Sequence, residues 1–158
     1  MIVYSNSCSF GVVSDGKLYS NFIADDFGAT LINKGVSGSC NERIFRTTVR
    51  DLLEIKKNSN DKILALISIA SLYRSEYWSE KKKTYDNDGH FESFQIGSLT
   101  DKNNNIPFEI FDFAKQWVLT QTSYESMMSR LYFNLTLLKT FLDMQDIKFL
   151  IWAGPNGI

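Results

Sequence analysis

Residues 63–70 read Ile-Leu-Ala-Leu-Ile-Ser-Ile-Ala, an aliphatic run of about eight residues. A strand of this composition is typical of a parallel sheet that helices cover on both faces. Shorter apolar segments at 1–5, 29–33 and 147–153 have the length of further strands. The chain is therefore expected to build a parallel sheet with residues 63–70 buried inside it.

Two amphipathic segments separate the first three strands. Residues 18–27 carry apolar side chains at helical spacing, and Gly28 ends that helix. Ser39 and Glu42 fit the Ser-x-x-Glu pattern of a capping box, which predicts the start of a second helix that runs to about Lys57. The first half of the chain thus alternates strand and helix.

The second half begins with a polar segment and ends in helices. Residues 71–105 are rich in Lys, Asp and Asn and predict a long irregular excursion. Pro107 suits the first position of a helix over 108–119, and a second helix is expected over 123–144. That second helix carries an apolar stripe at spacings of three and four, formed by Tyr124, Met128, Leu131, Leu135, Leu138 and Leu142. The stripe predicts a core-facing helix, with a coiled-coil seam as the alternative.

The order of these elements predicts the fold class. Strands that alternate with helices favour an α/β fold of three layers, with a parallel sheet and helices on both of its faces. We find no internal repeat and no linker, so we expect one domain over residues 1–158.

Composition narrows the classes of function. Hydrophobic residues make up 44% and charged residues 22% of the 158 residues, which is typical of a globular chain. The net charge of −1 disfavours nucleic-acid binding. No apolar run approaches the roughly 20 residues of a membrane helix, and the N-terminus lacks the basic and apolar regions of a signal peptide. We therefore expect a cytoplasmic protein without membrane contact.

Cysteine and histidine are scarce. Cys8 and Cys40 are too few for a disulfide scaffold or a cysteine-based zinc site, and His90 is the only histidine. We expect no metal and no cofactor. The two thiols follow neighbouring strands, so they are either small buried residues or a reactive pair.

Three loops should meet where ligands bind. In open α/β sheets that place lies beyond the carboxyl ends of the strands. The segments that leave those ends are Ser7–Gly11, Asn33–Gly38 and Ser71–Glu76, and all are rich in small polar residues.

These loops resemble the conserved blocks of the SGNH (GDSL-type) hydrolases, and more closely the divergent SGNH-like proteins of tailed phages. The matching segments are Ser7-Cys8-Ser9-Phe10, Asn33 to Gly38, Asn41-Glu42-Arg43-Ile44 and Arg74-Ser75-Glu76. Motifs cover residues 1–80, whereas residues 106–153 are similar only in architecture. The resemblance implies a flavodoxin-like sheet, and the expected cytoplasmic location would be that of the host if a phage encodes the chain.

The resemblance also implies roles for single residues. Ser9 would be the nucleophile, and the backbone N–H groups of Ser9 and Gly38 would stabilise the oxyanion. Substrate would lie among the loop residues Asn33, Ser37, Ser71, Arg74 and Glu76. Arg74 and Glu76 either bond each other or hold a charged group of the substrate.

The chain departs from the family in three places. Ser7 stands where the first block has Gly, and Ala70 or Ser71 falls where the third block has Asn. The C-terminal Asp-x-x-His block, which holds the general base, is absent. The domain is then shortened at its C-terminal end, or its site is inactive or reassigned. His90 is the one internal candidate for the base; otherwise it is a solvated loop residue.

Three functions follow as hypotheses. The first is a serine esterase that acts on a small-molecule ester, and the second is an inactive SGNH-like binding module of a phage with a protein or small ligand as its partner. The third is nucleic-acid binding through Lys81–Lys83 and a stripe of Arg43, Arg46 and Arg50 on one helical face, which the charge balance disfavours. The same arginines could bind a phosphate or a nucleotide, but a solvated or salt-bridged face is the favoured interpretation. A homodimer through the 123–144 helix is left open.

Overall fold

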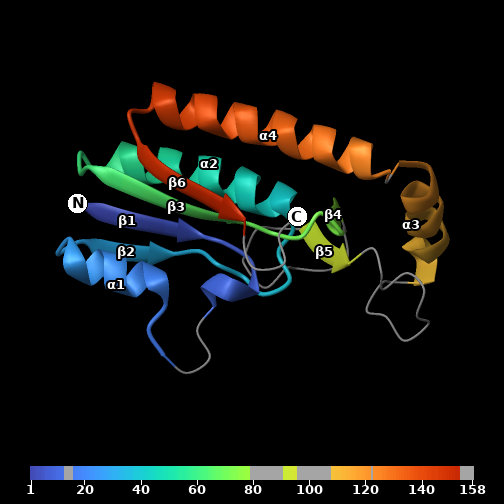
Figure 1. Cartoon of the computed structure of the whole chain (residues 1–158), viewed down its shortest axis with the longest axis horizontal. Coiled ribbons are helices and arrows are strands. Elements are labelled where there is room, and N and C mark those ends of the chain that lie inside the picture. The colour runs from blue at the N-terminus through green and yellow to red at the C-terminus, as the bar shows by residue number, and fades with distance from the viewer. Residues whose placement is uncertain (13–15, 79–90, 96–107, 122, 154–158) are drawn as a thin grey trace.

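The core of the fold is a four-stranded parallel sheet (Figure 1). The computed structural model describes the whole chain except residues 13–15, 79–90, 96–107, 122 and 154–158. The strands of the sheet lie in the order β2-β1-β3-β6. Their bounds are Ile2–Asn6 for β1, Thr30–Asn33 for β2, Ile63–Ile69 for β3 and Lys148–Ala153 for β6. Every neighbouring pair is parallel, as the alternation of strands and helices predicts.

Helices cover both faces of this sheet. Helix α1 (Tyr19–Asp26) lies on one face, and α2 (Asn41–Asn58) and α4 (Tyr124–Met144) lie together on the other (Figure 1). Helix α3 (Phe108–Gln121) precedes α4 and stands at the end of the molecule. The described residues thus form an α/β fold of three layers.

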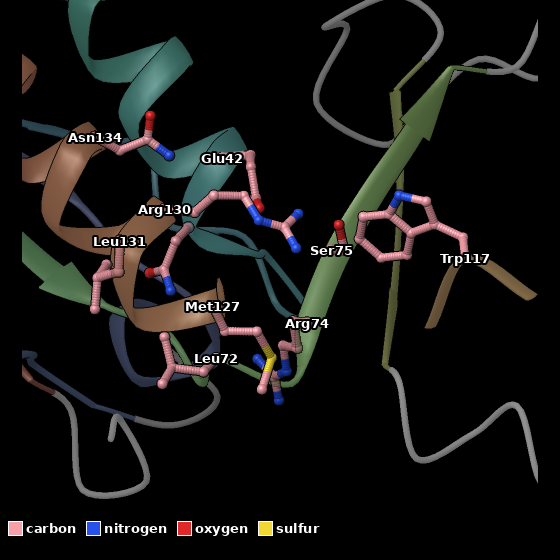
Figure 2. A pocket seen from close by; sticks show the side chains of 10 residues that line it. Glu42, Leu72, Arg74, Ser75, Trp117, Met127, Arg130, Leu131 and Asn134 are labelled. Atoms are coloured by element: carbon pink, nitrogen blue, oxygen red, sulfur yellow. The ribbon is translucent and has the colours of Figure 1, made fainter. Parts of the chain in front are cut away.

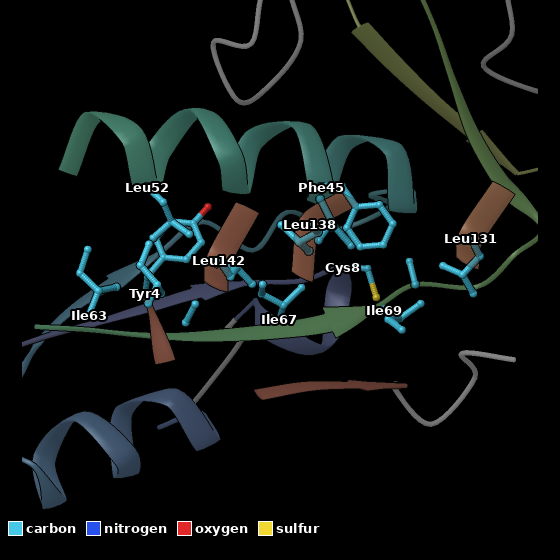
Figure 3. Packing of buried hydrophobic residues seen from close by; sticks show 14 of the residues in the cluster. Tyr4, Cys8, Phe45, Leu52, Ile63, Ile67, Ile69, Leu131, Leu138 and Leu142 are labelled. Carbon is cyan, nitrogen blue, oxygen red and sulfur yellow. The ribbon is translucent and has the colours of Figure 1, made fainter. Parts of the chain in front are cut away.

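Strand β3 shows why the aliphatic run at 63–70 must be central. Its side chains alternate between two apolar clusters, so both of its faces are buried. Ala65 and Ile67 pack in the cluster beneath α2 and α4 (Figure 3), whereas Leu66 packs against Ala24 of α1. A strand with only one covered face would carry polar residues at every second position.

The apolar stripe of α4 faces the core, as its spacing predicts. Leu131, Leu138 and Leu142 are buried against the sheet and α2, and Met128 and Leu135 are partly buried beside them. Tyr124 is the exception, because it lies at the first turn of the helix and is 53% exposed.

The start of α2 differs from the predicted capping box. The helix begins at Asn41, and Cys40 is its N-cap, with the thiol accepting a hydrogen bond from the Arg43 N–H at 3.5 Å. Ser39 lies one residue before the N-cap, and its hydroxyl donates to the Val36 carbonyl at 2.8 Å and accepts from the Arg43 guanidinium at 3.1 Å instead of from a backbone N–H of the helix. The prediction of Ser39 as the cap is therefore wrong, although the helix itself is confirmed.

The predicted irregular excursion over 71–105 contains two strands. Strands β4 (Arg74–Trp78) and β5 (Phe91–Gln95) pair antiparallel and form a second, small sheet. Their partners lie far apart in sequence, with no two-residue turn between them to mark a hairpin. The prediction of an irregular segment is wrong at these ten residues.

Candidate functional site at the carboxyl edge of the sheet

The carboxyl ends of β1, β2 and β3 meet at one edge of the sheet. Ser5 of β1 pairs with Asn33 of β2, and Asn6 pairs with Ile67 of β3. The loops that follow these strands therefore leave from neighbouring positions, as expected for a parallel sheet.

The side chain of Asn6 holds the end of β1 against α2. Its side chain is fully buried, and its amide nitrogen lies 2.8 Å from the Thr47 hydroxyl and 3.0 Å from the Thr48 hydroxyl. The same nitrogen lies 3.1 Å from the Ile44 carbonyl. Three contacts with α2 thus hold the last residue of β1, just before the chain leaves the sheet and reaches Ser9.

Ser9 begins a short 3-10 helix (η1, Ser9–Gly11) directly beyond β1. The residue is half-buried, and neither its hydroxyl nor its N–H has a hydrogen-bond partner among the described residues. No described side chain is therefore placed to take its proton, as a general base must. His90 lies outside the described residues.

The loop after β1 and the loop after β2 are pressed together through glycines. A Cβ on Gly35 would lie 2.8 Å from both the Gly11 carbonyl oxygen and the Ser7 hydroxyl. A Cβ on Gly11 would lie 1.6 Å from that same hydroxyl. Only glycine fits at these two positions, and Ser7 fills the space where the two loops cross.

Asn33 braces the same two loops. Its amide nitrogen donates to the Gly11 carbonyl at 2.8 Å, and its amide oxygen accepts from the Gly35 N–H at 3.0 Å. A backbone bond from Val36 to Ser7, at 3.1 Å, completes the connection. Asn33 is expected from the sequence to contact substrate. In the structure, both polar atoms of its amide bond to backbone groups of the two loops.

Gly38 lies in the turn before α2 with a φ of +82°, a backbone conformation that favours glycine. Both Ser37 and Gly38 are exposed, and the Gly38 N–H has no acceptor among the described residues. The turn therefore presents a backbone donor to solvent.

The end of β3 is held by a residue that sequence reasoning did not assign this role. Asn41 is 6% exposed, and its amide makes two hydrogen bonds with the backbone of Ala70. Its nitrogen donates to the Ala70 carbonyl at 3.0 Å, and its oxygen accepts from the Ala70 N–H at 2.8 Å. Next along the chain, Ser71 is half-buried and its hydroxyl accepts from the Tyr73 N–H at 3.2 Å.

Arg74 and Glu76 do not bond each other. Glu76 instead accepts two hydrogen bonds from Arg46 of α2, at 2.8 and 3.2 Å, and its side chain is only 8% exposed. This ion pair fastens β4 to α2. The other two arginines of the predicted stripe also bond to the protein, Arg43 to the Ser39 hydroxyl and Arg50 to Asp51.

Arg74 lines a pocket beside the end of β3 (Figure 2). The pocket lies between the start of α2, β4, α3 and α4. Its enclosed space is about 30 Å³, room for roughly two water molecules, so most of a larger ligand would lie in its open mouth. Its polar side chains include Glu42, Arg74, Arg130 and Asn134. Trp117 of α3 also lines it, and the Arg130 guanidinium lies 5.1 Å from the centre of that ring.

Glu42 is electrostatically unusual. Its Oε2 atom is buried and has no hydrogen-bond partner among the described residues. Burial raises the pKa of this carboxyl above its ordinary value, and the nearby Glu76 carboxylate adds to the rise, whereas Arg130 opposes it. Figure 2 shows the Glu42 carboxyl and the Arg130 guanidinium turned toward each other.

Sequence reasoning identified only Arg74 in the lining of this pocket, because the walls come from four separate elements. Glu42 matched a capping pattern, and Trp117 lies in a helix with no distinct stripe. The usable signal was on α4, where Arg130 and Asn134 lie beside the buried Met127 and Leu131, on the inward flank of the stripe.

No protein-family model matches the chain, and no curated protein does either. Within the described residues no helix is long and apolar enough to cross a membrane. In the same part of the chain, no group of three or more His, Cys, Asp or Glu side chains is placed to hold a metal ion. Both cysteines are buried free thiols.

Proposed function

We propose that the chain is a divergent SGNH-like serine hydrolase with a flavodoxin-like sheet, and that it cleaves small esters with Ser9 as nucleophile. One observation carries the proposal. Ser9 begins η1 directly beyond β1, with its hydroxyl and its N–H both unbonded among the described residues. Gly38, the second proposed oxyanion donor, likewise has no acceptor for its N–H.

The proposed chemistry has two steps. The Ser9 oxygen attacks the acyl carbon and gives its proton to a base, while the two N–H groups stabilise the oxyanion. The alkoxide then leaves with a proton, and an acyl-Ser9 ester remains. Water attacks this ester, releases the acid and restores the serine. His90 is the proposed base, since it is the only histidine of the chain.

A fluorophosphonate probe tests the nucleophile, because an activated serine displaces fluoride and keeps the phosphonyl group. The intact mass of the full chain should gain one adduct, and Ser9→Ala should gain none. Ser129→Ala, which removes an exposed serine of α4, is the matched control and should label like the wild type. His90→Ala should slow labelling strongly if His90 is the base. The absence of an adduct on folded wild type would rule out the proposed hydrolase.

A second candidate is an inactive SGNH-like binding module. It is favoured by the lack of a base beside Ser9 among the described residues, and by the charged pocket around Glu42 and Arg130. Such a module would show no adduct but would still bind a ligand at the carboxyl edge of the sheet.

A further inference from the structure

The pocket around Glu42 is separate from the proposed nucleophile. No residue of the loops after β1 and β2 lines it; its described walls come from the start of α2, residues 72–75, α3 and α4. Of the described residues expected to carry the reaction at Ser9, Arg74 alone lines this pocket, and its expected role there is to hold substrate.

The charges of the pocket favour an anion. Among the described residues that line it, two carry guanidinium groups, Arg74 and Arg130, and one carries a carboxyl group, Glu42. The nearby Arg46 is already neutralised by Glu76, whereas no described carboxylate forms an ion pair with Arg74. Guanidinium groups match carboxylate and phosphate oxygens in charge and geometry.

Glu42 adds a second requirement. Within the described part of the chain no donor reaches its buried Oε2, and an unsatisfied buried acceptor is costly. A hydroxyl of a ligand would supply that donor. Because burial raises the pKa of Glu42, its negative charge opposes a bound anion less than that of an exposed carboxylate would.

The remaining walls suit the carbon skeleton of a small molecule. The Trp117 ring, Met127 and Leu131 line the pocket beside the charged groups (Figure 2). An aromatic ring and two aliphatic side chains give apolar contact, and the few polar groups fix orientation.

We propose that this pocket binds a small hydroxylated anion, with its phosphate or carboxylate group on Arg74 and Arg130 and a hydroxyl on Glu42. The combination of an oxyanion and a hydroxyl is the chemistry of phosphorylated sugars and of sugar acids. Either a phosphate or a carboxylate could supply the oxyanion that Arg74 and Arg130 bind, and the experiment below distinguishes the two.

Isothermal titration calorimetry of the full chain would compare glucose 6-phosphate, gluconate and glucose. At least one of the two anions should bind. The anion with the higher affinity shows whether the pocket prefers a phosphate or a carboxylate. Neutral glucose should bind at least about tenfold more weakly than that anion, because it lacks the group that Arg74 and Arg130 recognise. Binding of neither anion, or equal binding of glucose, would overturn the proposal.

Variants then assign the binding to the pocket. Arg74→Gln and Arg130→Gln should each lower the affinity for the anion at least about tenfold. Arg50→Gln removes the same charge from an exposed position outside the pocket and should leave binding unchanged. Two separate arginine variants keep the test valid if one of them unfolds, which circular dichroism would reveal. Weakening by Arg50→Gln equal to that by the pocket variants would refute the assignment.

Two further titrations complete the design. Inorganic phosphate should bind more weakly than glucose 6-phosphate in the wild type, and Glu42→Ala should narrow that difference because it removes the acceptor for the hydroxyl. An unchanged difference would refute the role of Glu42. Ser9→Ala should bind like the wild type, so a failure of the proposed hydrolase leaves this test intact.

Discussion

Replacing Asn41 with Ala should destabilise the fold more than any other single polar truncation at the start of α2. The Asn41 amide bonds both the N–H and the carbonyl of Ala70, and both residues are buried. Alanine would leave two backbone groups at the end of β3 without partners. Each such group costs about 1–3 kcal/mol, and water entering the vacated space recovers part of that.

The expected loss is therefore about 2–4 kcal/mol of unfolding free energy. That is a large share of the roughly 5–15 kcal/mol available to a domain. Urea denaturation followed by far-ultraviolet circular dichroism measures it as a lower midpoint at an unchanged slope. Asn41→Asp should cost at least as much, because it sets a carboxylate oxygen against the Ala70 carbonyl.

Asn58→Ala is the matched control for Asn41→Ala. Asn58 is the last residue of the same helix, and its amide bonds Glu54 in an exposed position. Its truncation should change stability by no more than about 0.5 kcal/mol. If the two alanine variants differ by less than that, the Asn41 bonds do not hold the end of β3 and the reasoning fails.

Three further changes test the loops and the charges. Gly11→Ala should cost about 1–3 kcal/mol because its Cβ would overlap the Ser7 hydroxyl, and adding Ser7→Gly should restore most of that in a urea melt. Arg46→Gln should cost about 1–3 kcal/mol by leaving the nearly buried Glu76 carboxylate unpaired, and Glu76→Gln in the same chain should recover part of the loss. Glu42→Gln should raise stability at neutral pH, since the raised pKa of Glu42 means that the folded state favours its neutral form. That gain should vanish as the pH falls below the ordinary carboxyl range, where both states are protonated, and urea midpoints at the two pH values measure it.

Local patterns were sufficient to predict the layered fold. The aliphatic run at 63–70, the apolar stripe of α4 and the positive-φ stop at Gly28 each act within one element, and each is found where expected. The N-cap of α2 was assigned to the wrong residue because Ser39 and Cys40 both precede the helix. Their roles depend on the turn that Ser39 closes with Val36.

The candidate site shows the limit of the same approach. The rule that parallel strands open at one edge places Ser9, Asn33 and Gly38 on neighbouring loops, and the strand register agrees with it. It gives no information on side-chain partners, so the bracing role of Asn33 and the pairing of Glu76 with Arg46 could not be foreseen. The Asn33 contacts depend on how closely the loops after β1 and β2 approach each other, and the Glu76–Arg46 pair depends on the packing of α2 against β4.

The order of strands in the sheet has a consequence for how the protein folds. Strands β1 and β2 pair and are separated in the sequence mainly by the short helix α1. Strands β3 and β6 also pair, but β4, β5, α3 and α4 lie between them in the sequence. Pairing strands that are far apart in the sequence slows folding. It costs little stability, because each doubling of the loop length adds only about 0.6 kcal/mol to the entropic cost of closing the loop. The N-terminal three strands can therefore assemble early, and β6 docks last against a sheet that already exists. In the native state, the two edge strands β2 and β6 should open to hydrogen exchange before β1 and β3, because each is joined to the sheet through one neighbour alone.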